Sequence, residues 1–139
     1  MTKGRIAFQG ELGANSHEAC VAAFPDMEPV PHASFEEAFD AVKLGDCQLG
    51  MIPVENSIAG RVADVHHLLP SSGLKIIGER FKPIHFQLMV NRGVKLEDVK
   101  TVASMPIALG QCRKSLRRMG LKTEPVGDTA LAAKLLSEN

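Results

Sequence analysis

One segment of the chain, residues 53–60, places a carboxylate, an amide and a hydroxyl in succession. It reads Pro-Val-Glu-Asn-Ser-Ile-Ala-Gly, so the polar side chains belong to Glu55, Asn56 and Ser57, and Gly60 ends the segment. Amides and hydroxyls can donate hydrogen bonds to a carboxylate, and a carboxyl group can hold or transfer a proton. Because a single helix cap needs only one such side chain, the run predicts a loop that binds a ligand or acts on it.

Two interpretations of Glu55 stay open. The carboxylate could orient Asn56 and Ser57 or hold a proton during a reaction. It could also be only a negative charge that the dipole of a following helix favours. The Glu55→Gln substitution separates the two interpretations, because only the first predicts a loss of turnover.

Three further turns are rich in small and hydrogen-bonding residues and are expected to lead from a strand into a helix: residues 9–16, 104–106 and 126–129. Helix N-termini offer free backbone N–H groups and a partial positive charge, so several in one cleft would hold a small carboxylate-bearing ligand. Glycine, serine, asparagine and aspartate also favour turns and caps without any ligand. Each of these turns, taken alone, is better explained as structural.

The elements that would position these loops alternate between strand and helix. Apolar runs predict strands over residues 5–9, 28–31, 48–54, 99–103 and 121–126. Helical periodicity predicts helices over residues 14–24, 34–44, 61–69, 106–119 and 128–136. Residues 74–81 and 84–90 are expected as extended segments. This alternation indicates an α/β fold with mainly parallel sheets covered by helices on both faces, whose ligands bind beyond the carboxyl ends of the strands.

Several residues mark where these helices should begin and end. Ser34 and Glu37 have the spacing of a capping box, and Gly45 suits the position after a helix C-terminus. Pro106 suits the first position of a helix. Pro70 is expected to end the helix that precedes it.

Composition narrows the classes of function. The 139 residues carry 16 Lys plus Arg and 16 Asp plus Glu, so no net charge draws the chain toward nucleic acid or an anionic membrane. No apolar stretch is long enough to span a bilayer, and the amino terminus does not read as a signal peptide. The three cysteines are widely spaced and suggest neither a disulfide framework nor a zinc site. A cytoplasmic protein without a metal is therefore expected.

Residues 53–62 resemble the Pro-x-Glu-Asn-Ser…Gly-x-Val signature of the prephenate dehydratases. Residues 8–16 are similar to the glycine-bearing first loop of that family, and residues 108–113 and 127–130 are similar to later segments in the same order. The resemblance covers essentially the whole chain. Met105 departs from the family, which usually has a histidine in this loop.

The resemblance implies two α/β lobes like those of periplasmic binding proteins, with the active site between them. The first lobe would cover residues 1–81 and the second, incomplete lobe residues 82–139. It also implies conversion of prephenate to phenylpyruvate in L-phenylalanine biosynthesis, without any cofactor. We expect a homo-oligomer, either a dimer or a tetramer.

The resemblance also assigns roles to residues. Glu55, Asn56 and Ser57 would be catalytic. Substrate would be bound by residues of both lobes, namely Gly13, Ala14, Asn15, Ser16, Gly60, Gln111 and Thr129. The choice between prephenate and arogenate as the substrate stays open.

The family's Thr-Arg-Phe motif, whose threonine is thought to be essential, is expected to lie beyond Asn139, as is a regulatory domain that binds phenylalanine. Two alternatives to an enzyme follow. One is a non-catalytic module that binds or senses a small anion on the same fold. The other is an inactive fragment that exposes apolar surface where missing elements would pack.

Overall fold

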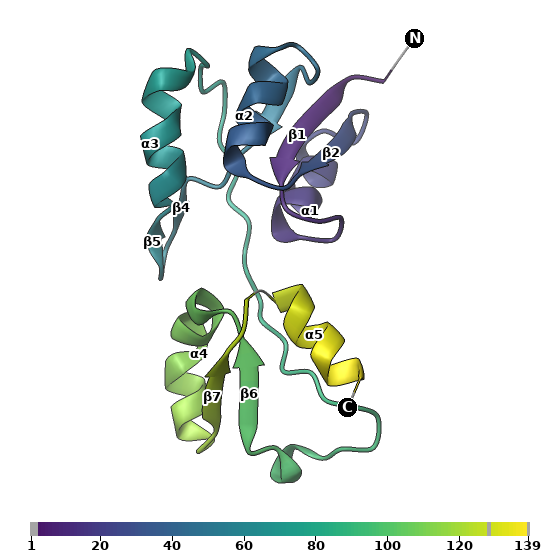
Figure 1. The fold of residues 1–139 in the computed structure, drawn as a ribbon, viewed down its shortest axis with the longest axis vertical. Coiled ribbons are helices and arrows are strands. Elements are labelled where there is room, and N and C mark those ends of the chain that lie inside the picture. Colours follow the sequence, from purple (N-terminus) through teal and green to yellow (C-terminus); the bar gives the residue numbers. More distant parts are fainter. Residues whose placement is uncertain (1–2, 128, 139) are drawn as a thin grey trace. The chain divides into compact units, whose positions relative to one another are not determined.

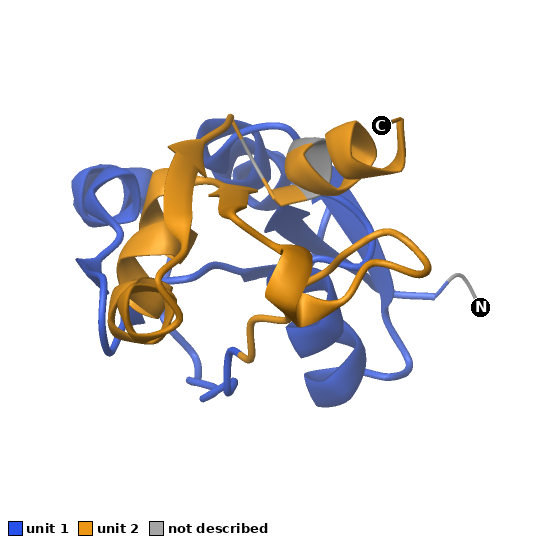
Figure 2. Ribbon diagram, turned by 90° about the horizontal axis from the view of Figure 1, so that it is seen from below, with its two compact units in different colours: residues 1–84 blue, residues 85–139 orange. Residues whose placement is uncertain are grey.

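A computed structural model describes residues 3–127 and 129–138 of the chain, without the side chains of Ala130 and Leu131. The chain forms two compact units, residues 1–84 and residues 85–139 (Figure 2). The division lies close to the lobe boundary expected after Phe81, although the assignment of lobes stays a prediction.

The first unit contains a parallel sheet of β1 (Arg5–Gln9), β2 (Glu28–His32) and β3 (Leu49–Met51), in the order β2-β1-β3 (Figure 1). All three strands were predicted from their apolar residues. Pro29 and Pro31 are compatible with β2 because it is an edge strand, where prolines at alternating positions can face away from the neighbour.

Two helices cover the two faces of this sheet: α1 (Asn15–Ala23) and α2 (Phe35–Lys43). Ala7 of β1 packs in a cluster with residues of α2, whereas its neighbour Phe8 packs with Cys20 of α1. Successive side chains of a strand point to opposite faces, so the two helices lie on opposite sides of β1. The predicted parallel α/β arrangement is confirmed in this unit.

The ends of α2 follow the predicted signals with one difference. Ser34 Oγ accepts a hydrogen bond from the backbone N–H of Glu37 at 3.1 Å, which is half of a capping box. The carboxylate of Glu37 accepts from the backbone N–H of Ala33 at 3.0 Å, one residue before the position that the motif predicts. Gly45 follows the helix with a φ of 84°, as expected for a residue in this position.

The next helix, α3 (Ala63–Ser72), shows that the predicted range of residues 61–69 was wrong at both ends. Arg61 belongs to a strand, and Pro70 lies inside the helix instead of ending it. A proline near a helix C-terminus removes only one intrahelical hydrogen bond, and its fixed φ is compatible with the helix. The helix ends at Gly73, whose φ is 74°.

Residues 74–81 and 84–90, which were expected as extended segments, are not part of any sheet among the described residues. They leave several large apolar side chains in solvent. Ile76, Ile77 and Phe81 are 69%, 76% and 89% exposed. Residues 74–81 therefore carry exposed apolar surface.

The second unit contains a second, smaller parallel sheet. Its elements are a short 3₁₀ helix η1 (Leu96–Asp98), β6 (Thr101–Ser104), α4 (Pro106–Arg118), β7 (Lys122–Pro125) and α5 (Thr129–Ser137). β6 and β7 pair in parallel, α4 contacts both strands, and α5 contacts β6 (Figure 1). All four residues of β7 are exposed, although strands of parallel sheets are usually covered on both faces.

The signal at the start of α4 is confirmed, because Pro106 is its first residue. Gly120 follows the helix with a φ of 70°. Asp128, where the last helix was predicted to begin, lies outside the described residues. No helix in the described part of the chain is long and apolar enough to cross a membrane.

Candidate functional site

Two of the predicted loops leave the same edge of the first sheet. β1 and β3 are parallel neighbours, with Phe8 opposite Met51, so their carboxyl ends lie together. The loop of residues 10–14 follows β1, and the segment that begins at Ile52 follows β3. This is the edge at which sheets of this kind bind ligands.

The sequence had suggested that the Glu-Asn-Ser segment leads directly into a helix. The segment instead forms a β-hairpin. β4 (Glu55–Asn56) pairs in antiparallel fashion with β5 (Gly60–Arg61). Oδ1 of Asn56 accepts hydrogen bonds from the backbone N–H groups of Ile58 and Ala59, both at 2.9 Å. Gly60 has a φ of 82°, a conformation that favours glycine.

This arrangement fixes which part of Asn56 can meet a ligand. Its carbonyl oxygen is used inside the loop, so the Nδ2 amide group keeps two N–H donors without a partner among the described residues. The hydroxyl of Ser57 and the carboxylate of Glu55 also have no hydrogen-bond partner within the described part of the chain. The hairpin thus carries two donor groups and one carboxylate on adjacent residues.

Glu55 is exposed and lies on β4 opposite Arg61. The acidic residue in the first turn of α3 is Asp64, so the structure does not favour the interpretation of Glu55 as a partner of that helix dipole. The base of the hairpin is tied to α3. The carbonyl oxygen of Val54 lies 3.2 Å from Nε2 of His66 and accepts from the N–H of Val62 at 3.0 Å.

The glycine-bearing loop is held at both ends. The N–H of Gly10 donates to the carbonyl of His32 on β2 at 2.9 Å, and the N–H of Ala14 donates to the carbonyl of Glu11 at 3.1 Å. The second bond closes a four-residue turn in which Gly13 is third, with a φ of 91°. A type II turn requires a positive φ at this position, which explains the glycine.

The helix that follows this loop begins without a side-chain cap. Ala14 occupies the cap position, and the first helical hydrogen bond runs from the N–H of Glu18 to the carbonyl of Ala14. The described residues give α3 and α4 no side-chain cap either, since Val62 and Met105 occupy their cap positions. In contrast, α2 has a side-chain cap, and none of the predicted site loops precedes it. Free N–H groups therefore remain at the starts of these three helices, two of which, α1 and α4, directly follow loops that the sequence singled out.

Four of the predicted binding residues lie at the start of α1. Gly13 and Ala14 belong to the β-turn before the helix, while Asn15 and Ser16 lie in its first helical turn. Gln111 and Thr129 lie in the second unit. Gln111 is partly buried in α4, and Thr129 is the exposed first residue of α5. Their action together with the first unit stays a prediction.

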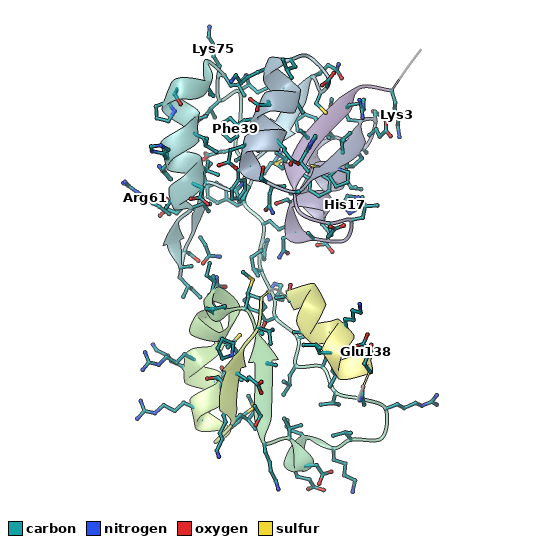
Figure 3. The ribbon with its side chains drawn as sticks, viewed as in Figure 1. Lys3, His17, Phe39, Arg61, Lys75 and Glu138 are labelled. Carbon is teal, nitrogen blue, oxygen red and sulfur yellow. The ribbon has the colours of Figure 1, made fainter. Side chains whose placement is uncertain are left out.

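Sequence reasoning gave no role to His17, on the first turn of α1 (Figure 3). Its Nδ1 accepts a hydrogen bond from the N–H of Gly13 at 3.0 Å. The spacing of four residues, one helical turn, was the available signal. No group of three or more His, Cys, Asp or Glu side chains among the described residues is arranged to hold a metal ion.

The fold and the loops define an α/β protein that presents hydrogen-bond donors at the carboxyl edge of a parallel sheet. The family model for prephenate dehydratase matches residues 6–139, and the chain belongs to this family.

Three known proteins illustrate the relationship. An arogenate dehydratase 2 of Petunia hybrida is 42% identical over 133 residues, which cover 96% of this chain and 34% of the relative. A bifunctional N-acyl-homoserine lactone acylase/prephenate dehydratase of Komagataeibacter europaeus is 40% identical over 133 residues, with 96% and 47% covered. The solved prephenate dehydratase of Arthrobacter aurescens in complex with L-Phe has a TM-score of 0.83 and 28% identity, with 97% and 46% covered. The chain thus spans about a third to a half of the length of these relatives.

Proposed function

We propose that this protein is a cytoplasmic prephenate dehydratase, a carbon–oxygen lyase that makes phenylpyruvate for phenylalanine synthesis. Membership in the family supports the reaction class, and the hairpin of residues 55–61 supports a site for it. The single observation that carries the proposal is the anchored Asn56. Its oxygen is used within the loop, which leaves the amide donors for a substrate.

The reaction needs little from the protein beyond position and one proton. The bond between the ring and its carboxylate breaks, carbon dioxide leaves, and the electron pair enters the ring. The ring C–O bond breaks, and the hydroxyl leaves as water after it accepts a proton. Because aromatisation drives these changes, a well-placed acid or hydrogen-bond donor is sufficient, and no cofactor is required.

In this proposal Asn56 Nδ2 and Ser57 Oγ donate to the departing hydroxyl or to a substrate carboxylate. Glu55 orients these donors or supplies the proton. The other carboxylate lies at the free N–H groups of Asn15 and Ser16, where the glycine loop meets α1. Because the chain has no net charge, local hydrogen-bond donors must hold the two carboxylates of prephenate.

The test is release of phenylpyruvate from prephenate, compared with the slow reaction in buffer alone. Release above the buffer rate that falls at least tenfold in Glu55→Gln would support catalysis by this hairpin. Release that is unchanged in Glu55→Gln would remove the catalytic role of this carboxylate. The same assay with arogenate measures which of the two substrates is preferred.

A second candidate is a module that binds a small anion without turnover. It is favoured by the uncapped start of α1, whose N–H groups can hold a carboxylate without taking part in a reaction. Prephenate binding by calorimetry, together with no phenylpyruvate above the buffer rate, would support it. We also propose a homo-oligomer, which sedimentation analysis would test.

A further inference from the structure

His17 joins the glycine-bearing loop to the core of the first unit through two contacts. Nδ1 accepts the hydrogen bond from the N–H of Gly13 at 3.0 Å. The centroid of the imidazole lies 5.6 Å from that of the Phe8 ring, at an interplanar angle of 38°. Phe8 is 0% exposed at the centre of the sheet, so it is a fixed support for the imidazole.

The turn itself gives the N–H of Gly13 no acceptor. The closing hydrogen bond of the turn uses the N–H of Ala14 and the carbonyl of Glu11, which leaves the N–H of Gly13 without a backbone partner. Glycine also has the largest freedom of rotation in the unbound loop. The imidazole of His17 therefore accepts from the N–H of Gly13 and restricts the most flexible residue of the loop.

We propose that His17 is a positioning residue, which holds the glycine-bearing loop in the conformation whose N–H groups receive a substrate carboxylate. The inference rests on the proposed function for the identity of the ligand. It requires a neutral imidazole with its proton on Nε2, because Nδ1 must accept. The side chain acts through Gly13 and does not touch the substrate.

Two substitutions separate the hydrogen bond from the ring contact. His17→Phe keeps a ring against Phe8 but removes the acceptor. His17→Asn removes the ring but places Oδ1 near the position of Nδ1. His67→Phe is the matched control, because His67 is exposed on α3 and takes part in no hydrogen bond, ion pair or ring contact within the described residues.

The experiment measures two quantities on the 139-residue chain. Calorimetry gives the affinity for prephenate, and hydrogen exchange by NMR gives the protection of the Gly13 amide without any ligand. We expect His17→Phe to weaken binding roughly three- to tenfold, as loss of one hydrogen bond implies. It should also speed exchange at Gly13. His17→Asn should restore both to within about twofold, and His67→Phe should change neither.

If the unsubstituted chain binds prephenate and His17→Phe binds it equally well, the inference is wrong while the proposed function stands. Unchanged exchange at Gly13 in His17→Phe would also overturn it, since the imidazole would then not hold this N–H in solution. Failure of the unsubstituted chain to bind prephenate would instead overturn the proposed function. Restoration of binding and protection by His17→Asn would exclude a general loss of folding as the cause of the effects of His17→Phe.

Discussion

Nζ of Lys82 lies 2.6 Å from Oε2 of Glu18, which ties the segment at the end of the first unit to the first turn of α1. The hydrogen bond from Lys82, followed by its positive charge, lowers the pKa of Glu18 from its ordinary value of 4.5. A carboxyl group whose pKa is lowered by folding stabilises the folded state at pH values above its pKa in the unfolded chain. That contribution is lost as pH falls through the folded pKa.

The first prediction concerns this ion pair. Lys82→Met should return the pKa of Glu18 toward 4.5, because both interactions that lower it are removed. Carbon-detected NMR titration of the Glu18 carboxyl group measures the change. Lys75→Met, at an exposed lysine without a recorded ion pair in the described residues, is the control and should leave the titration of Glu18 unaltered. An equal effect of both substitutions would contradict the assignment.

The second prediction separates the structural and binding roles of Asn56. Asn56→Asp keeps an oxygen that can accept from Ile58 and Ala59, but it removes the amide donors and adds a negative charge. Protection of these two amides from exchange should persist, while the affinity for prephenate falls at least tenfold. Asn56→Ala should lose both properties. If the aspartate variant binds prephenate as tightly as the original chain, the amide group does not contact the ligand.

The third prediction concerns the backbone of Gly13. A Cβ added there would meet no atom within 4 Å, so the cost of Gly13→Ala comes only from the φ of 91°. We expect the free energy of unfolding to fall by about 1–2 kcal/mol, measured with urea. Gly78→Ala is the matched control, because that site is equally open and has no positive φ. It should be neutral or slightly stabilising. Equal losses at the two positions would argue against backbone strain.

The fourth prediction concerns Cys20, which is 0% exposed on the face of α1 that packs against β1. Burial raises the pKa of its thiol from 9.0 to about 11. The folded state therefore holds its proton more tightly, and the free energy of unfolding should fall as pH rises from about 9 to 11, by roughly 1–2 kcal/mol. Cys20→Ala should have a shallower dependence on pH over this range. An unchanged slope would show that Cys20 is not responsible.

Much of the first unit could be predicted because its signals are local. The cap formed by Ser34 depends on a residue only three positions away, and the strand of residues 5–9 has an apolar run, residues 6–8, between Arg5 and Gln9. The hairpin was missed because β4 and β5 have two residues each, which is too short for any periodicity to appear. Pro70 was wrongly expected to end a helix, because the sequence did not show that this proline would lie in the last helical turn.

The types of the candidate site residues could be predicted, but their orientations could not. Glu55, Asn56 and Ser57 are recognisable as chemical groups in a row. That the oxygen of Asn56 faces inward follows only from the position of the N–H groups of Ile58 and Ala59 in the folded hairpin. Likewise, the role of His17 depends on a turn at Gly13 that brings its N–H to the imidazole.

The uncapped starts of α1, α3 and α4 also bear on how this chain could be engineered. Serine or aspartate at Ala14, Val62 or Met105 would satisfy N–H groups that the described residues leave open, and each such cap typically adds about 1 kcal/mol of stability. A carboxylate ligand at the same N–H groups would have to displace the new side chain. Under the proposed function, a cap at Ala14 would therefore lower the affinity for the carboxylate, and selection for heat resistance alone would favour the loss of binding.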